Sequence, residues 1–181
     1  MIKAAIKAFF LLLWIAIYMI LLWLINKTGK RKWHDCFCRF SFTVICVIIG
    51  LHVKVDGEVA RTRPLLLVSN HISYLDIIVL GAKTSALFTP KSDMAGWPVI
   101  STICRLLNCV FIGRRNDKIK EASTKIYDAL ASGEVVSLFP EGTTGDGRHV
   151  LPFKSSLFSI AEKKINMADG EQELFIQPAI I

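Results

Sequence analysis

Residues 8–25 form an uninterrupted apolar run of eighteen residues near the start of the chain. As an α-helix this run would be roughly 27 Å long, close to the thickness of a bilayer core. A cleaved signal peptide is the alternative, because Lys3 and Lys7 form a short basic region before the run. No Ala-x-Ala cleavage site follows, and the run leads into the basic segment 27–32. The sequence therefore predicts an uncleaved N-terminal membrane anchor.

A second apolar stretch, residues 40–51, is too short to span a bilayer. It is predicted to lie at the membrane interface or to pack against the rest of the protein. The two stretches predict a membrane-associated helical segment over residues 1–52 and one further domain over residues 53–181. The net charge of +7 favours an anionic membrane surface as a partner, with phosphorylated substrates second. Nucleic acid is disfavoured, because no recognisable binding module carries the basic residues.

After residue 52 the pattern alternates between short apolar runs and longer amphipathic segments. The expected strands are residues 53–55, 64–69, 87–89, 109–112, 135–139 and 174–179. The expected helices are residues 73–80, 97–107, 118–131 and 153–164. This alternation predicts an α/β fold with a mostly parallel sheet flanked by helices. Sites in such sheets gather at the carboxyl ends of strands, and His71, Arg114 and Glu141 each follow an expected strand.

His71 and Asp76 form a candidate base and its orienting carboxylate. On one regular helix a spacing of five would turn the two side chains roughly 140° apart. They can meet only if His71 lies in the turn before a helix and Asp76 points back from its first turn. Asn70 and Ser73 favour such a turn and cap. In that arrangement Asp76 holds one ring nitrogen, and the other nitrogen can accept the proton of an attacking alcohol.

A second carboxylate, Glu141, lies in the glycine-rich segment 139–147 (Phe-Pro-Glu-Gly-Thr-Thr-Gly-Asp-Gly). Backbone amides and hydroxyls in such a loop can bind phosphate or stabilise a developing oxyanion. An ordinary solvent turn is the alternative. The sequence lacks a Gly-x-Ser-x-Gly motif, which argues against a covalent acyl-enzyme.

The segment 70–76 (Asn-His-Ile-Ser-Tyr-Leu-Asp), followed by the Pro-Glu-Gly-Thr segment and preceded by an apolar N-terminus, resembles one family closely. That family is the glycerolipid O-acyltransferases of the PlsC class. The resemblance implies that His71, Asp76 and Glu141 are catalytic-site residues, and that Gly142 and Thr143 shape the loop that binds substrate. It implies an α/β enzyme that carries out direct attack of a lipid hydroxyl on an acyl thioester.

Weaker parts of the resemblance point to further substrate-binding residues. The segment 111–115 resembles the family's second block, in which Arg114 would bind the acceptor's phosphate, with Arg115 as a competitor because Gly113 replaces an acidic residue. Lys91 and Lys154 resemble further site-facing cations. Pro178 resembles the fourth block, which shapes the acyl pocket, although a strand-edge proline is the alternative.

The implied reaction moves an acyl chain from acyl-CoA or acyl carrier protein to a lysolipid. The expected acceptor is 1-acylglycerol-3-phosphate, giving phosphatidic acid; lyso-ornithine lipid or another lysophospholipid is the alternative, and a non-catalytic lipid-binding protein is a third. No metal or bound cofactor is implied, since the acyl donor is a co-substrate. The implied location is a bacterial inner membrane, with the catalytic domain facing the cytoplasm. The family usually continues past residue 181, so a fragment or a shortened relative is expected.

The five cysteines, which lie at positions 36, 38, 46, 104 and 109, show no paired spacing. The spacing of Cys36 and Cys38 is too close for half of a zinc site, and His34 does not complete one. The odd number, with Cys46 inside an apolar run, predicts free buried thiols in a reducing compartment.

Overall fold

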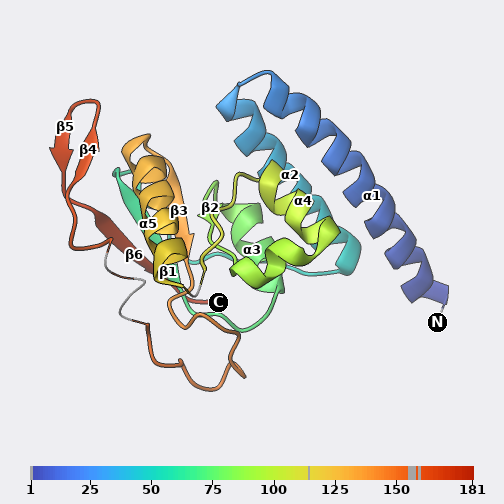
Figure 1. The fold of residues 1–181 in the computed structure, drawn as a ribbon. Coiled ribbons are helices and arrows are strands. Elements are labelled where there is room, and N and C mark those ends of the chain that lie inside the picture. The colour runs from blue at the N-terminus through green and yellow to red at the C-terminus, as the bar shows by residue number, and fades with distance from the viewer. Residues whose placement is uncertain (1, 114, 155–157, 159) are drawn as a thin grey trace. The chain divides into compact units, whose positions relative to one another are not determined.

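Figure 1 shows the computed structural model of the chain, which describes residues 2–113, 115–154, 158 and 160–181. The chain divides into two compact units. One comprises Met1–Glu58 and Ile77–Ser85, and the other comprises Val59–Asp76 and Ala86–Ile181. The domain boundary expected at residue 52 stays a prediction.

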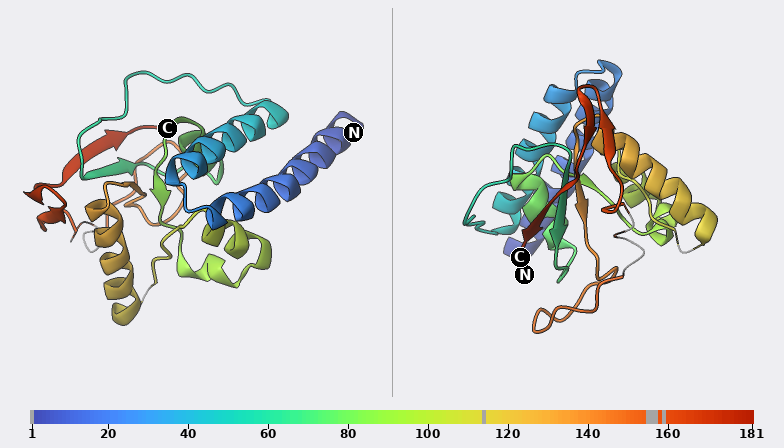
Figure 2. Two further views of the ribbon diagram at one scale, coloured as in Figure 1. Left: turned by 90° about the horizontal axis from the view of Figure 1, so that it is seen from above. Right: turned by 90° about the vertical axis from the view of Figure 1, so that its left-hand side faces the viewer.

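The first unit is built on two long helices, α1 (Ile2–Lys27) and α2 (Arg31–Ile49), which run side by side (Figure 2). Aromatic side chains lie between them: the ring centroids of Trp14 and Phe40 are 5.9 Å apart. By length and composition α1 could cross a membrane, and only 11% of its most apolar eighteen-residue window is buried. This exposure separates α1 from the core helix of a soluble protein.

The helix α2 begins nine residues earlier than the apolar stretch expected at residues 40–51. Its first half mixes polar and apolar residues, and the buried side chains of the whole helix follow one stripe with helical spacing: His34, Cys38, Ser41, Phe42, Ile45 and Cys46. Because these residues are not consecutive and include polar ones, a run of continuous apolar residues does not indicate the stripe. Gly50 ends the helix with a φ of 84°, a left-handed conformation that glycine adopts without a steric penalty.

The second unit contains a four-stranded sheet in the order β2–β3–β1–β6. The strands are β2 (Leu87–Phe88), β3 (Val135–Leu138), β1 (Leu65–Ser69) and β6 (Phe175–Ala179), and every pairing between them is parallel. The expected parallel sheet is therefore confirmed. Because β1 and β3 are parallel neighbours, their carboxyl ends meet at the same edge of the sheet.

One face of this sheet packs against α5 (Asn116–Ala131). Alternate strand residues contribute to the core, including Leu66 and Val68 of β1, which agrees with the two-residue period of a strand. The helix contributes residues four apart: Ala122, Ile126 and Leu130. Burial of one such leucine stabilises the fold by about 1.5–3 kcal/mol. All five residues of β1 are buried, as expected for a strand with neighbours on both sides.

Five shorter elements complete the described part of the chain: α3 (Leu75–Lys83), the 3₁₀ helix η1 (Ser92–Gly96), α4 (Pro98–Leu106) and a hairpin of β4 (Ile165–Met167) and β5 (Gly170–Gln172). The expected position of Pro98 in the first turn of its helix is confirmed. The hairpin was not predicted, although Asp169-Gly170 is a hairpin signal in the sequence.

Three expected elements are wrong or much reduced. Residues 53–55 are irregular and not a strand, because a three-residue alternation is too short to specify pairing. Residues 109–112 form a single parallel bridge, between Ile112 and Lys91, in place of a strand. Of the expected helix 153–164, residues 155–157 and 159 lie outside the described residues, and the others are loop or turn.

All five cysteines are free, as predicted. Cys38, Cys46 and Cys104 are buried, Cys109 is half-buried, and Cys36 is exposed, so the expected burial is wrong for Cys36. A side-chain hydrogen bond with Cys109 lowers the pKa of the Cys104 thiol below its usual value, against the opposing effect of burial.

Candidate active site

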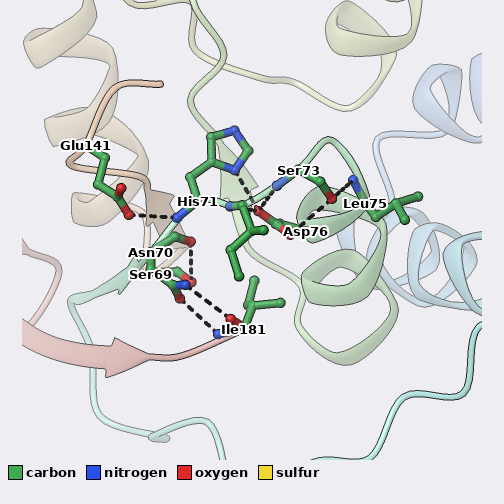
Figure 3. A network of polar contacts seen from close by, with 9 residues as sticks. Ser69, Asn70, His71, Ser73, Leu75, Asp76, Glu141 and Ile181 are labelled. Carbon is green, nitrogen blue, oxygen red and sulfur yellow. Dashed lines mark hydrogen bonds and ion pairs between the residues drawn. The ribbon is translucent and has the colours of Figure 1, made fainter. Parts of the chain in front are cut away.

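His71 lies in the turn between β1 and α3, and Asp76 lies in the first turn of α3. The His71 Nδ1 atom is 2.8 Å from the Asp76 Oδ2 atom (Figure 3). The histidine precedes the helix and the carboxylate points back toward it, which is the arrangement that a five-residue spacing requires. The predicted contact between the two side chains is confirmed.

The Asp76 carboxylate is held by backbone N–H groups as well as by His71. Its Oδ2 atom accepts hydrogen bonds from Ile72 N at 2.6 Å and from Ser73 N at 2.9 Å. Asp76 is only 3% exposed, so these donors replace water around the carboxylate. An ionised carboxylate can only accept hydrogen bonds, which assigns the proton of this contact to His71 Nδ1. The Nε2 atom is then the acceptor nitrogen, as a general base requires.

Ser73 fixes the start of α3, in agreement with its expected role as a cap. Its Oγ atom accepts a hydrogen bond from Leu75 N at 3.0 Å, and its carbonyl accepts one from Asp76 N at 3.2 Å. The hydroxyl satisfies a backbone donor that the first turn of a helix leaves unpaired. Ser73 thereby helps to fix the direction of the Asp76 side chain.

Glu141 follows β3 and is brought to His71 by the parallel pairing of β1 and β3. Its Oε1 atom accepts a hydrogen bond from the backbone N–H of His71 at 2.9 Å, and its Oε2 atom accepts one from Leu151 N at 3.0 Å. Gly145 N donates to the His71 carbonyl at 2.7 Å. Glu141 is 3% exposed. Its carboxylate therefore holds backbone in place, and the geometry makes it a positioning residue for His71.

Phe139, directly after β3, is a site residue that the sequence reasoning missed. Its ring stacks on the imidazole of His71, with centroids 4.2 Å apart and planes 22° apart. The stack limits rotation of the imidazole and keeps one of its faces from water. Nothing in the order of residues signals this contact, because it joins side chains that are 68 positions apart.

A cavity of about 330 Å³ is lined in part by Phe139. Two cations predicted as site residues, Lys91 and Lys154, line it, and Asp93 adds a carboxylate that the sequence reasoning did not single out. Apolar lining comes from Ile112, Ile119, Leu138 and Phe139. The cavity thus combines an apolar wall with charged groups, as a site for a lipid with a polar head group would.

Gly142 and Lys154 lie next to each other in the lining of this cavity. A Cβ atom at position 142 would lie 2.7 Å from the Lys154 Nζ atom, and Gly142 has a φ of 62°. The positive φ disfavours any other residue there, whereas the Lys154 ammonium is the far end of a flexible side chain and could move aside. The Lys154 backbone N–H donates to the Pro140 carbonyl at 3.0 Å, which ties the two segments together. The predicted role of Gly142 in shaping the loop agrees with this packing.

Other predicted residues are placed elsewhere or are not described. Arg114 lies outside the described residues. Arg115 is exposed, and its Nε atom is 3.2 Å from an Asp117 carboxylate oxygen. Thr143 is exposed on the loop, and Pro178 is exposed on the edge strand β6, opposite Val68. Neither Thr143 nor Pro178 is among the described residues that line the cavity. Their substrate-binding roles stay predictions.

The described residues were also compared with the requirements of a metal site. Within residues 2–113, 115–154, 158 and 160–181, no group of three His, Cys, Asp or Glu side chains is arranged to hold a metal ion. The chemical groups that the structure does bring together are an oriented imidazole, its carboxylate partner and a cavity with two ammonium groups. Such a site can remove a proton from a bound hydroxyl.

Comparison with known proteins supports this interpretation of the site. A family model described as Acyltransferase matches residues 52–181. A lyso-ornithine lipid O-acyltransferase from Rhizobium meliloti is 39% identical over 153 residues, covering 82% of this chain and 50% of that protein. A 1-acyl-sn-glycerol-3-phosphate acyltransferase from Neisseria gonorrhoeae is 32% identical, covering 75% of this chain and 57% of that protein. The chain thus spans about half the length of these relatives.

The fold also has a counterpart among solved structures. The crystal structure of the 1-acyl-sn-glycerophosphate (LPA) acyltransferase PlsC from Thermotoga maritima aligns with a TM-score of 0.69 and 24% sequence identity. The alignment covers 88% of this chain and 68% of that chain. At this level of identity the likeness concerns the fold, a mostly parallel sheet with helices.

Proposed function

The chain belongs to the acyltransferase family, and we propose that it transfers an acyl chain from a thioester donor to the free hydroxyl of a lysolipid. The observation that carries the proposal is the 2.8 Å contact between His71 Nδ1 and Asp76 Oδ2, which leaves Nε2 as the basic nitrogen. The donor is acyl-CoA or acyl carrier protein, acting as a co-substrate.

In the proposed reaction His71 Nε2 removes the proton of the acceptor hydroxyl as its oxygen attacks the thioester carbonyl. The carbon–oxygen bond forms, and the carbonyl oxygen becomes an oxyanion in a tetrahedral intermediate. Collapse of this intermediate breaks the carbon–sulfur bond, and His71 returns its proton to the leaving thiolate. Asp76 stabilises the imidazolium between the two proton transfers.

Two classes of acceptor are supported by the relatives. The proposed acceptor is 1-acylglycerol-3-phosphate, whose phosphate would suit Lys91, Lys154 and the predicted Arg114. Lyso-ornithine lipid is the second candidate, since proteins carrying that name are 39% and 37% identical to this chain. Ornithine lipids have no phosphate, so only the first candidate offers a phosphate to which the cationic side chains could bind.

The direct test is an acyl-transfer assay with full-length protein, a panel of lysolipids and both kinds of acyl donor. We expect turnover with at least one lysolipid and a preference between the phosphate-bearing and the ornithine acceptor. Binding of lysolipid with no turnover for any pair of substrates would contradict the proposal and favour a lipid-binding protein.

Arg114 provides a prediction about the acceptor. Loss of a charge-assisted hydrogen bond costs about 1.5–3 kcal/mol, so Arg114→Ala should raise the KM for a phosphate-bearing acceptor roughly 10- to 150-fold. The KM for lyso-ornithine lipid should change much less, because that acceptor has no phosphate. Arg115→Ala is the companion variant, and a selective rise of the KM for the phosphate-bearing acceptor in that variant alone would assign the phosphate to Arg115. Equal effects of Arg114→Ala on both acceptors would assign Arg114 to the donor or to the fold.

We also propose that the first unit binds the membrane, at the cytoplasmic side of a bacterial inner membrane, where acyl donors are made. The exposed side chains of α1 include Phe9, Phe10, Leu12 and Ile20. At its C-terminal end the ammonium of Lys27 lies 3.6 Å from the centre of the Trp23 ring. Paired aromatic and basic side chains of this kind favour the head-group region of a bilayer.

Removal of residues 1–25 should weaken membrane binding without eliminating it. The basic residues near the start of α2 remain, and they are attracted to anionic lipids at about 1 kcal/mol each. Flotation with anionic vesicles should therefore retain part of the shortened protein at low salt and release it at high salt. A shortened protein that is fully soluble and monodisperse at low salt would show that α2 makes no contribution.

A further inference from the structure

We propose that Asn70 is a positioning residue that fastens the end of β6 to the turn carrying His71. The inference rests on the proposed function, because it concerns the geometry of the same catalytic base. It assigns a role to the residue directly before His71, whose side chain is bonded to Ile181 in Figure 3.

The Asn70 side chain makes two hydrogen bonds to the backbone of one residue. Its Nδ2 atom donates to the Ile181 carbonyl at 3.1 Å, and its Oδ1 atom accepts from Ile181 N at 2.9 Å. The regular pairing of β1 with β6 ends at Ser69 and Ala179. The amide side chain therefore continues the ladder past the last backbone pair, offering a donor and an acceptor as a strand would.

The backbone of Asn70 is held as well. The Ser69 Oγ atom donates to the Asn70 carbonyl at 3.0 Å, and Ser69 is 1% exposed. The peptide that joins Asn70 to His71 is thus fixed by a buried hydroxyl, while the Asn70 side chain reaches to β6. Movement at the end of β6 would pass directly to the peptide that begins the catalytic turn.

The turn is held on its other flank by the 141–145 loop. Glu141 accepts from His71 N, and Gly145 donates to the His71 carbonyl. Asn70 supplies the hold on the β6 side, where β6 is the edge strand of the sheet in the described part of the chain. An edge strand without this fastening would separate more easily at its end. A displacement of about 1 Å at a catalytic group can cost roughly a hundredfold in rate.

Two variants and one control separate positioning from general stability. Asn70→Ala removes both hydrogen bonds to Ile181. Asn70→Asp keeps the acceptor but places a carboxylate oxygen against the Ile181 carbonyl. The control is Arg63→Ala at the opposite end of β1, where Arg63 Nε donates to the Gly133 carbonyl at 3.1 Å. Arg63 is, like Asn70, a side chain that ties the end of β1 to the backbone of another segment.

We expect Asn70→Ala to lower kcat for acyl transfer about 10- to 100-fold, with KM for acceptor and donor within about twofold of wild type. Asn70→Asp should lose at least as much. Arg63→Ala should lower the melting temperature by a similar amount while keeping kcat within about twofold. If Asn70→Ala and Arg63→Ala lower both the melting temperature and kcat to the same extent, the inference is overturned. An unchanged kcat in Asn70→Ala would overturn it as well.

Hydrogen–deuterium exchange tests the same inference without turnover. The N–H groups of His71, Ile72 and Ser73 are donated to carboxylates, so they should exchange slowly in the wild-type protein. Asn70→Ala should speed exchange in the peptide covering residues 70–76, and Arg63→Ala should not. Unchanged exchange in Asn70→Ala would overturn the inference. If wild-type protein shows no acyl transfer, the proposed function fails, and the exchange measurement still decides the role of Asn70.

Discussion

Replacement of His71 by alanine is expected to lower the rate of acyl transfer about a thousandfold, to the level left by binding alone. The substitution removes the nitrogen that accepts the proton of the hydroxyl, and the backbone contacts of residue 71 remain. His71 lies in a turn and packs mainly on the Phe139 ring, so the variant should fold and bind membranes as the wild type does. Initial rates with a lysolipid acceptor and a measured melting temperature are sufficient to check this.

The exposed residue His52 offers a matched control for this substitution. His52→Ala should retain the wild-type rate, because it also removes an imidazole but lies outside the site. Near wild-type turnover by a folded His71→Ala protein would contradict the role of His71 as the general base. Loss of folding in His71→Ala would be seen as a lower melting temperature, and the comparison would then use His71→Gln, which keeps a polar side chain.

Asp76→Asn should reduce the rate by about two to three orders of magnitude, with little change in KM. The neutral amide cannot stabilise the imidazolium as a carboxylate does, and it no longer forces the proton onto His71 Nδ1. Its oxygen can still take the place of Asp76 Oδ2, on which the three N–H groups converge, so the main loss is the negative charge. Steady-state kinetics at saturating acceptor measure this loss in kcat.

The companion substitution Asp128→Asn removes an exposed carboxylate from α5 and should leave the rate unchanged. Asp76→Ala adds a second comparison, because it leaves buried N–H groups without their acceptor, at a cost of about 1–3 kcal/mol for each. We therefore expect Asp76→Ala to lose stability as well as rate, and Asp76→Asn mainly rate. An Asp76→Asn enzyme as fast as the wild type would mean that His71 is oriented by Phe139 and its own backbone.

The contacts of Glu141 in the structure differ from the role that its motif implies. The resemblance implies a catalytic-site residue, and the structure does place Glu141 next to His71. However, both carboxylate oxygens accept backbone N–H groups, and the residue is buried. Its contacts are those of a group that fixes the loop and the turn, and a substrate contact would need an oxygen that is turned toward the cavity.

The expected elements failed where local pattern was a poor guide to pairing. Residues 109–112 look like a strand, yet they form a single bridge next to β2, because a strand is defined by its neighbour as well as by its sequence. The hairpin of β4 and β5 was overlooked because its strands are three residues each and too short to show a period. The described part of residues 153–164 is loop and turn, although apolar spacing favoured a helix.

The sequence by itself determined the features that depend on near neighbours. The His71–Asp76 contact follows from a turn, a cap and a spacing of five, all within residues 70–76. The apolar length of α1 and the parallel sheet likewise follow from residues close together in the chain, since periodicity and caps act over one or two turns. These interactions need no knowledge of strand order.

Only the tertiary structure decided which distant groups complete the site. Glu141 and Phe139 reach His71 because β3 pairs with β1, and Ile181 reaches Asn70 because β6 pairs with β1 on the other side. The sequence separations are 70, 68 and 111 residues. Contacts over such separations are set by the order of strands in the sheet, which brings the carboxyl ends of neighbouring strands together whatever their distance along the chain.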